Sequence, residues 1–345
     1  MNAELLCAGL GTRFRPTTDR VAKPALPFLN LPQLAYSLVY LESLGLENLV
    51  INTHHLPQTV ESAVRGLTKA SGGKYNLHFS NETKILGSGG GIKNNAAQLT
   101  GENFLVINGD EIILFNHDYG LKPLIDFHRQ SGALATLLTT DHPAAGLTLG
   151  GVWANADGLV TKLGGTDPNR KEKAQHFTGV FIFSERVFKY MPAHSLPFHI
   201  FNHCLEPAMI RGEKVFAYHD PSLLWLETTD LNSYLESTQR ALIELGQDSV
   251  FGRRLNNVFA RFGFTYERIG EAQWVSKGSV FNGALNPGSF LLMGPESYVD
   301  ANVEVRDFAV LGADSRVMQG LIESSVIAPG VHINEMTSLR RQLIV

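Results

Sequence analysis

A glycine-rich segment directly after a short apolar run most constrains what this chain can fold into. Residues 5–8 read LLCA, residues 9–16 read GLGTRFRP, and AKP follows at 22–24. An apolar run that ends in glycines is typical of the first strand of a parallel α/β sheet. Because glycine has no Cβ and permits positive φ, backbone N–H groups in the turn can converge on an anionic ligand.

Two cations in this segment favour a phosphate ligand. Arg13 offers a planar fork for phosphate oxygens, and Lys23 offers a point charge. Spacing excludes two commoner motifs: a dinucleotide fingerprint needs glycine where Phe14 stands, and a P-loop needs Gly-Lys-Ser/Thr after its glycines. We therefore predict a triphosphate cradle; the alternative is a plain glycine turn with incidental surface cations.

Apolar runs alternate with helical patterns along the first hundred residues. This βαβαβ order predicts a doubly wound sheet whose ligands bind at the carboxyl ends of the strands. Expected strands are 5–8, 49–51, 104–107, 133–139, 150–154 and 179–183, and expected helices are 33–44, 58–64 and 231–245.

The pattern changes beyond Gln247. A mixed segment reaches about Ser276, and short apolar triplets then recur at intervals near six, separated by Gly, Pro, Asn and Asp. This spacing predicts a short left-handed β-helix-like domain, with a β meander as the alternative. We expect two domains, 1–246 and 247–345, the second made of a linker segment and the β-helix.

Composition excludes several classes of protein. Hydrophobic residues make up 44% and charged residues 18%, as in ordinary globular proteins, and the net charge of -4 offers no basic field for nucleic acid. Two cysteines, Cys7 and Cys204, are too few for a disulfide framework or a zinc ribbon. Without a basic leader or a long apolar run, we expect a cytoplasmic chain with no membrane partner.

The motif GLGTRFRP followed by AKP resembles the signature of the sugar-1-phosphate nucleotidyltransferases, or NDP-sugar pyrophosphorylases. The family usually reads GxGTRLxP and then PKP, so the spacing is kept and Ala22 replaces a proline. The resemblance continues, in order, over about the first 245 residues. It includes INTHHL at 51–56, LGSGGGI at 86–92, VINGD at 106–110, FTGVFIF at 177–183 and the surroundings of Trp225.

This resemblance implies a Rossmann-like nucleotidyltransferase catalytic domain with a mixed, mostly parallel sheet over residues 1–246. It implies transfer of a nucleotidyl group from a nucleoside triphosphate to a sugar-1-phosphate, with Mg²⁺ and release of pyrophosphate. The INTHHL stretch and the β-helix-like tail look most like mannose-1-phosphate guanylyltransferases. The run GGGI and the missing Glu-Lys-Pro resemble N-acetylmuramate-1-phosphate uridylyltransferases. Our expectation is GTP and mannose-1-phosphate.

The resemblance also implies roles for individual residues. The expected catalytic residues are Arg13, Lys23 and Asp110. The expected nucleotide-binding residues are Ala8, Gly9, Leu10, Gly11, Thr12, Arg13, Glu82, Gly87, Gly90 and Asn108. The expected sugar-phosphate residues are Gly109, Thr178, Gly179 and Lys162, where Lys171 or Lys173 can equally replace the family's usual lysine.

Two carboxylates are expected to bind the metal. Asp110 follows a strongly apolar strand, so it should stand at the carboxyl end of the sheet, and its hard oxygens suit Mg²⁺. Glu227 stands where the resembling family has a metal-binding aspartate, and Thr229 stands where the family has glycine. Threonine disfavours the positive φ that glycine would supply there, and Asp230 is an alternative ligand.

Glu227 and Thr229 also motivate a different class of function: a catalytically weakened family member that acts as a nucleotide-sugar sensor or regulatory subunit. The tail permits two roles. It can mediate homo-oligomerisation, or it can be an acyltransferase domain, although the segment 279–333 contains a single histidine, His332. Oligomerisation is the favoured role.

Overall fold

The computed structural model describes residues 1–101, 103–193 and 197–345. The described chain forms two compact units. Unit 1 consists of Met1–Gly9, Ser37–Pro57 and Gly73–Trp225, and unit 2 consists of Leu10–Tyr36, Gln58–Gly72 and Leu226–Val345. The predicted domain boundary at 246/247 coincides with the end of helix α7 (Leu231–Gly246) and stays a prediction.

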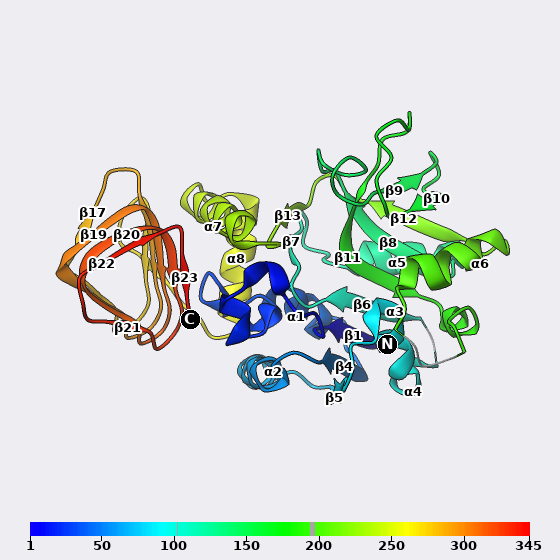
Figure 1. Ribbon diagram of the computed structural model, residues 1–345, viewed down its shortest axis with the longest axis horizontal. Coiled ribbons are helices and arrows are strands. Elements are labelled where there is room, and N and C mark those ends of the chain that lie inside the picture. Colours follow the sequence, from blue (N-terminus) through cyan, green and yellow to red (C-terminus); the bar gives the residue numbers. More distant parts are fainter. Residues whose placement is uncertain (102, 194–196) are drawn as a thin grey trace. The chain divides into compact units, whose positions relative to one another are not determined.

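Unit 1 is built on a seven-stranded sheet in the order β12-β8-β11-β6-β1-β4-β5 (Figure 1). Its neighbours are parallel except where β11 pairs with β6 and β8, so the predicted mixed, mostly parallel sheet is confirmed. The strands are β1 (Asn2–Leu6), β4 (Asn48–Thr53), β5 (Asn76–Asn81), β6 (Phe104–Asn108), β8 (Ala135–Thr140), β11 (His176–Phe183) and β12 (Val215–His219).

Strand β5 was missed at the sequence level. It is the third strand of the main sheet along the chain, whereas the sequence pattern predicts 104–107 as the third strand. It lies at the edge of the sheet and carries half-exposed residues, whereas all of β8 is buried. An edge strand of this kind lacks the apolar run that identifies central strands of a parallel sheet.

Two expected helices follow β1 and β4 in the chain: α1 (Ala35–Glu42) and α2 (Pro57–Ser71). A ten-residue helix that the sequence pattern did not single out, α5 (Lys122–Ser131), precedes β8 and ends at Gly132, which has a φ of 59°. Other short elements, all in unit 1 except for Leu226, include α3 (Gly87–Asn94), α4 (Ala96–Leu99), β7 (Ile112–Leu114), β9 (Val152–Ala154), β10 (Val160–Leu163), α6 (Glu206–Ile210) and β13 (Leu224–Leu226).

The C-terminal part of unit 2 is a coil of strands (Figure 1). Leu291 pairs in parallel with Ala309, 18 residues further on, and Gly320 pairs with Thr337, 17 residues further on. About three six-residue segments therefore complete one coil, as the apolar spacing predicted, and a meander of antiparallel strands is excluded. The strands are β14 (Glu267–Arg268), β15 (Gln273–Val275), β16 (Val280–Phe281), β17 (Ala284–Leu285), β18 (Phe290–Met293), β19 (Tyr298–Leu311), β20 (Arg316–Ile327), β21 (His332–Ile333), β22 (Thr337–Arg340) and β23 (Leu343–Ile344).

The inward side chains of this coil form a core of their own. Val299, Val305, Val317 and Ile322 are fully buried there. Stacked parallel strands place equivalent apolar residues of successive coils one above another, so each coil buries its neighbour's side chains. The strand-rich C-terminal domain is thus confirmed, while its left-handed sense stays a prediction.

Unit 2 also contains a helix that the sequence pattern did not single out. Helix α8 (Val250–Arg261) lies between Gln247 and Ser276, and its N-cap Ser249 accepts a hydrogen bond from the N–H of Gly252 at 3.0 Å. Its buried residues Leu255, Val258 and Phe259 follow the helical spacing. The capping serine and this spacing were the available signals.

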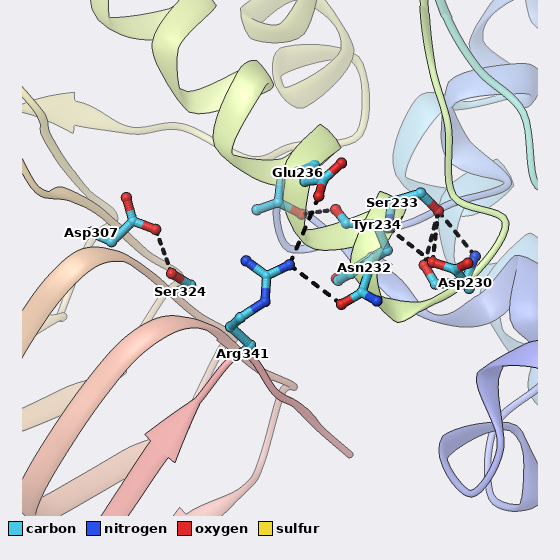
Figure 2. Close-up of polar contacts among 9 residues, drawn as sticks. Asp230, Asn232, Ser233, Tyr234, Glu236, Asp307, Ser324 and Arg341 are labelled. Carbon is cyan, nitrogen blue, oxygen red and sulfur yellow. Dashed lines mark hydrogen bonds and ion pairs between the residues drawn. The ribbon is translucent and has the colours of Figure 1, made fainter. Parts of the chain in front are cut away.

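The coil makes polar contacts with α7, as Figure 2 shows. Gln239 Nε2 donates to Asp307 Oδ1 at 2.6 Å, and Ser324 also donates to the Asp307 carboxylate. Arg341 Nη2 lies 3.4 Å from Asn232 Oδ1 and 3.9 Å from Glu236 Oε1. The contacts of Gln239 and Arg341 join the coil to α7, and the Ser324 bond lies within the coil.

A carboxyl group is buried in the middle of the unit 1 sheet. Glu4 lies on β1 between β4 and β6 and is fully buried. Asn95 Nδ2 donates to its Oε1 at 2.7 Å. Burial raises the pKa of Glu4 to about 8, against the smaller opposing effect of the Asn95 hydrogen bond, and repulsion by Glu82 adds to the rise.

This raised pKa predicts a pH-dependent stability. Between the ordinary pKa of 4.5 and about 8, folded Glu4 holds a proton that the unfolded chain has released, so stability falls as pH rises. The slope is at most about 1.4 kcal/mol per pH unit. Burial lowers the pKa of both His128 and His176 to about 4, so their titrations affect stability below 6.5. Thermal unfolding from pH 6.5 to 8.0 should show a falling Tm that Glu4→Gln largely removes; an equal fall in both proteins contradicts the prediction.

Candidate active site

The predicted phosphate loop is shaped chiefly by Gly11. This residue has a φ of 61° and precedes a short 3-10 helix, Thr12–Phe14. A Cβ at Gly11 would lie 2.9 Å from Thr18 Cγ2, so the position excludes other residues on both backbone and packing grounds. By contrast, a Cβ at Gly9 would meet nothing within 4 Å.

The two predicted cations differ in exposure. Arg13 is exposed, and Lys23 is half-buried at the start of a short helical turn, Lys23–Ala25. The N–H of Ala22 donates to Thr59 Oγ1 at 3.2 Å, a bond that proline cannot make. The departure from the family's proline at this position thus has a local compensation.

The glycine-rich stretch LGSGGGI at 86–92 opens helix α3, but protein atoms occupy part of the approach to it. Gly87 has a φ of 75°, and a Cβ there would lie 2.7 Å from the carbonyl oxygen of Phe198. The N–H groups of Gly89 and Gly90 donate to the same oxygen, at 3.0 and 3.4 Å. Close packing against Phe198 therefore explains these glycines in part.

Glu82, expected to bind the nucleotide, is only 4% exposed. Its two carboxylate oxygens accept hydrogen bonds from Asn52 Nδ2 and from the N–H of Leu86, both at 2.8 Å. The residue therefore connects β4 to the residue before Gly87.

Asp110 lies two residues beyond the end of β6, in a tight turn with Gly109. The N–H of Gly109 donates to the Leu6 carbonyl at 2.8 Å, and a Cβ at Gly109 would lie 2.4 Å from Cys7 Sγ. The turn therefore packs against the end of β1. Burial, with the nearby negative charges of Asp110 and Glu4, raises the pKa of the Cys7 thiol, so Cys7 is an inert packing residue here.

Glu111, which sequence reasoning missed, lies next to two expected site residues of unit 1, Asn108 and Gly179, and is bonded to Trp225. Its Oε1 accepts a hydrogen bond from Asn108 Nδ2 at 3.1 Å, and its Oε2 accepts one from Trp225 Nε1 at 2.7 Å. Gly179 has a φ of 82°, and a Cβ there would lie 2.5 Å from Glu111 Oε1. The available signal was a second acidic residue directly after the Gly-Asp turn.

Two expected sugar-phosphate residues have protein partners. Thr178 is fully buried and its Oγ1 donates to the Leu138 carbonyl at 3.0 Å. Lys162 Nζ lies 2.7 Å from Asp167 Oδ2 and 4.8 Å from the centre of the Trp153 ring. Of the alternative lysines, Lys173 is paired with Asp141 at 2.7 Å.

The Glu227 segment of unit 2 is fixed by hydrogen bonds to its backbone and to its neighbour. Ser237 Oγ donates to the Glu227 carbonyl at 2.7 Å, and Thr228 Oγ1 donates to Gln33 Oε1 at 3.0 Å. Thr229 is not among the described residues with positive φ, so threonine fits without the strain that its replacement of glycine suggested.

Asp230, the alternative metal ligand, is instead the N-cap of α7 (Figure 2). Its carboxylate accepts a hydrogen bond from the N–H of Ser233 at 3.0 Å, and the N–H of Asp230 donates to the Ser233 hydroxyl at 3.1 Å. Hydrogen bonding from the Ser233 backbone lowers the pKa of Asp230. A capping carboxylate of this kind is committed to the helix terminus.

The donors present fit Mg²⁺. Within the described residues no three His, Cys, Asp or Glu side chains come together as a metal cage. Mg²⁺ does not require one, because it usually takes one or two carboxylates and completes its shell with substrate phosphates and water. Asp110 in unit 1 and Glu227 in unit 2 are both half-exposed carboxylates of this type.

Solved structures define the class of fold. HddC from Yersinia pseudotuberculosis matches with a TM-score of 0.56 at 20% identity, covering 69% of this chain and 98% of that chain. UDP-glucose pyrophosphorylase complexed with UDP-glucose matches with a TM-score of 0.58 at 17% identity, covering 69% and 97%. The fold is therefore that of the α/β nucleotidyltransferases.

The family follows from the sequence comparison. Residues 3–243 match the model of the Nucleotidyl transferase family, and the chain belongs to that family of enzymes. Across the described residues no helix is long and apolar enough to span a membrane.

Individual relatives are similar over shorter stretches. UTP–glucose-1-phosphate uridylyltransferase of Synechocystis sp. is 30% identical over 203 residues, which is 56% of this chain and 51% of the relative. Mannose-1-phosphate guanylyltransferase of Mycobacterium tuberculosis is 36% identical over 137 residues, which is 40% of this chain and 36% of the relative. Mannose-1-phosphate guanyltransferase of Saccharomyces cerevisiae is 32% identical over 148 residues, which is 42% of this chain and 39% of the relative. The match thus spans about half the length of these relatives or less.

Proposed function

We propose that this chain transfers a nucleotidyl group from a nucleoside triphosphate to a sugar-1-phosphate, giving an NDP-sugar and pyrophosphate. The observation that carries the proposal is the turn at Asp110. It places a half-exposed carboxylate at the carboxyl end of β6, beside the end of β1 and next to the Asn108–Glu111 pair. Ligands of α/β sheets bind at this edge.

The reaction is an in-line attack of a sugar-1-phosphate oxygen on the α-phosphorus. Such transfer depends on positioning and charge neutralisation rather than on a covalent intermediate. Backbone N–H groups of residues 9–12, with Arg13, hold the phosphates and the departing pyrophosphate. Lys23 offsets negative charge that develops at the α-phosphate. Backbone at Gly87 and Gly90 lies beside the base.

Asp110 and Glu227 would hold the metal ion. Mg²⁺, when bound, neutralises charge on the phosphates. On the sugar side, Gly109 and Gly179 present backbone to the sugar phosphate, as the resemblance implies. For Lys162 to bind the phosphate, its ammonium group would exchange Asp167 for the ligand.

GTP and mannose-1-phosphate are the proposed substrates. The INTHHL stretch and the C-terminal coil support this choice, and guanylyltransferases are among the relatives. The rival is a uridylyltransferase acting on N-acetylmuramate-1-phosphate or another sugar-1-phosphate, supported by the run GGGI and by the uridylyltransferase relative. A pyrophosphate-release assay that crosses four triphosphates with these sugar-1-phosphates decides. The highest kcat/KM is expected for GTP with mannose-1-phosphate, and a highest value with UTP overturns the choice.

A catalytically weakened sensor is the second candidate. The sequence suggests it through Glu227 and Thr229. However, Thr229 does not have the positive φ that would strain the segment. The same assay separates the two functions, because a sensor binds nucleotide or NDP-sugar without releasing pyrophosphate. We favour the enzyme.

We further propose self-association through the C-terminal coil. Among the described residues, β22 and β23 pair with β20 alone, and the last coil exposes 75% of Met336. An unpaired strand edge of this kind is a template for a second chain. Light scattering should give a mass above the 37.9 kDa of one chain, and Met336→Asp should lower it. A wild-type mass of one chain removes this proposal.

A further inference from the structure

Two buried polar side chains lie between the loops proposed to hold the nucleotide. Asn52 is on β4 and Glu82 directly follows β5; they are 3% and 4% exposed. Burying a polar amide and a carboxylate costs free energy unless each is hydrogen-bonded. Both side chains therefore need hydrogen-bond partners inside unit 1.

The two side chains form a continuous relay between backbone groups. The N–H of Cys7 donates to Asn52 Oδ1 at 2.7 Å. Since that N–H can only donate, the amide oxygen of Asn52 faces Cys7 and its Nδ2 faces Glu82. Nδ2 donates to Glu82 Oε1, and Glu82 Oε2 accepts the N–H of Leu86, both at 2.8 Å. One end of the relay is the residue before Ala8, and the other is the residue before Gly87.

Helix α3 packs directly on this pair. A Cβ at Gly91 would lie 2.7 Å from Asn52 Nδ2 and 2.9 Å from Glu82 Oε1. The backbone of Glu82 is fixed as well, because its N–H donates to the Thr53 carbonyl at 2.7 Å. The relay is thus held on several sides and cannot shorten or lengthen freely.

We propose that Asn52 and Glu82 are positioning residues that set the spacing between the loop after β1 and the glycine loop that opens α3. The proposal rests on the proposed function, in which both loops hold the same nucleotide. The resemblance implied that Glu82 touches the nucleotide. With both oxygens bound to protein and almost no exposure, Glu82 acts through Leu86 and, by way of Asn52, through Cys7.

A swap of the two functional groups tests the relay. Asn52→Asp alone places two carboxylates against each other. Glu82→Gln alone leaves one carbonyl oxygen for two donors, so its own amide N–H group faces either Asn52 Nδ2 or the N–H of Leu86. In the double variant the middle bond reverses: the amide introduced at 82 donates to the carboxylate introduced at 52. The N–H groups of Cys7 and Leu86 keep oxygen acceptors, and size and total charge are unchanged.

The readout is the Kd of GTP and of UTP for the full chain, by calorimetry with Mg²⁺, beside the Tm of each variant. Each single variant should weaken binding of the accepted triphosphate about tenfold or more, as expected for a misplaced loop or an unpaired buried group. The double variant should return Kd to within about threefold of wild type. If a single variant fails to fold, the double variant still decides.

Two results overturn the proposal. Folded single variants that bind with the wild-type Kd show that the relay does not position the loops. A double variant that regains the wild-type Tm but not the Kd shows that the Glu82 carboxylate itself contacts the nucleotide. Failure of the proposed function is distinct, since wild-type protein would then bind neither triphosphate and release no pyrophosphate.

Discussion

Lys23→Ala should lower kcat by on the order of 10² to 10³ while changing the KM for the triphosphate little. The proposed role of Lys23 is to offset charge that develops at the α-phosphate in the transition state. Removing one preorganised charge of this kind has such an effect on turnover. Steady-state pyrophosphate release at varied triphosphate concentration gives both constants.

Lys69→Ala is the matched control, since Lys69 is an exposed lysine in the last turn of α2 and should leave kcat unchanged. The half-buried position of Lys23, beside the hydrogen-bonded Ala22, suits a charge held in one place. Unchanged kcat with a raised KM would make Lys23 a binding residue and contradict its catalytic role.

The second large effect concerns the two carboxylates. Asp110→Asn and Glu227→Gln keep size and hydrogen-bonding reach but remove the charge that attracts Mg²⁺. Each should lower kcat at limiting Mg²⁺ by roughly 10² or more and raise the Mg²⁺ concentration needed for half-maximal activity. The double variant should lose little more than either single one, because both residues serve one ion. Titrating activity with Mg²⁺ measures these effects.

Two variants control this experiment. Glu227→Asp restores the family's residue beside Thr229, so partial activity would mean that the local backbone has adapted to the longer side chain. Asp230→Ala removes the N-cap of α7 and should cost about 1 kcal/mol of stability without changing the Mg²⁺ requirement. If Glu227→Gln turns over normally at limiting Mg²⁺ while Asp110→Asn is inactive, Glu227 is not a ligand.

The sequence predicted those parts of the fold that depend on local pattern. Strands β1 and β6 are apolar runs that end in a glycine loop and a Gly-Asp turn, and both signals lie within a few residues of the strand they follow. The C-terminal coil was predictable for the same reason, because its six-residue spacing repeats along the chain. Strand β5, half-exposed at the sheet edge, had no such pattern.

Long-range contacts account for what the sequence could not predict in the site. The glycines that open α3 are matched to the carbonyl of Phe198, about a hundred residues later in the chain. Glu111 gains its position from Trp225, which is equally distant in sequence. The capping role of Asp230 could be predicted from the local sequence, because Ser233 completes a capping box three residues further on.

Nucleotidyl transfer itself is tested most directly by following isotopic label. The protein is incubated with Mg²⁺, a sugar-1-phosphate and a triphosphate labelled at either the α- or the γ-phosphate. Nucleotidyl transfer predicts that α-label appears in an NDP-sugar and γ-label in pyrophosphate, in equal amounts and only when sugar-1-phosphate is present. Release of γ-label as inorganic phosphate, or bound triphosphate that stays intact with every sugar-1-phosphate, would contradict it.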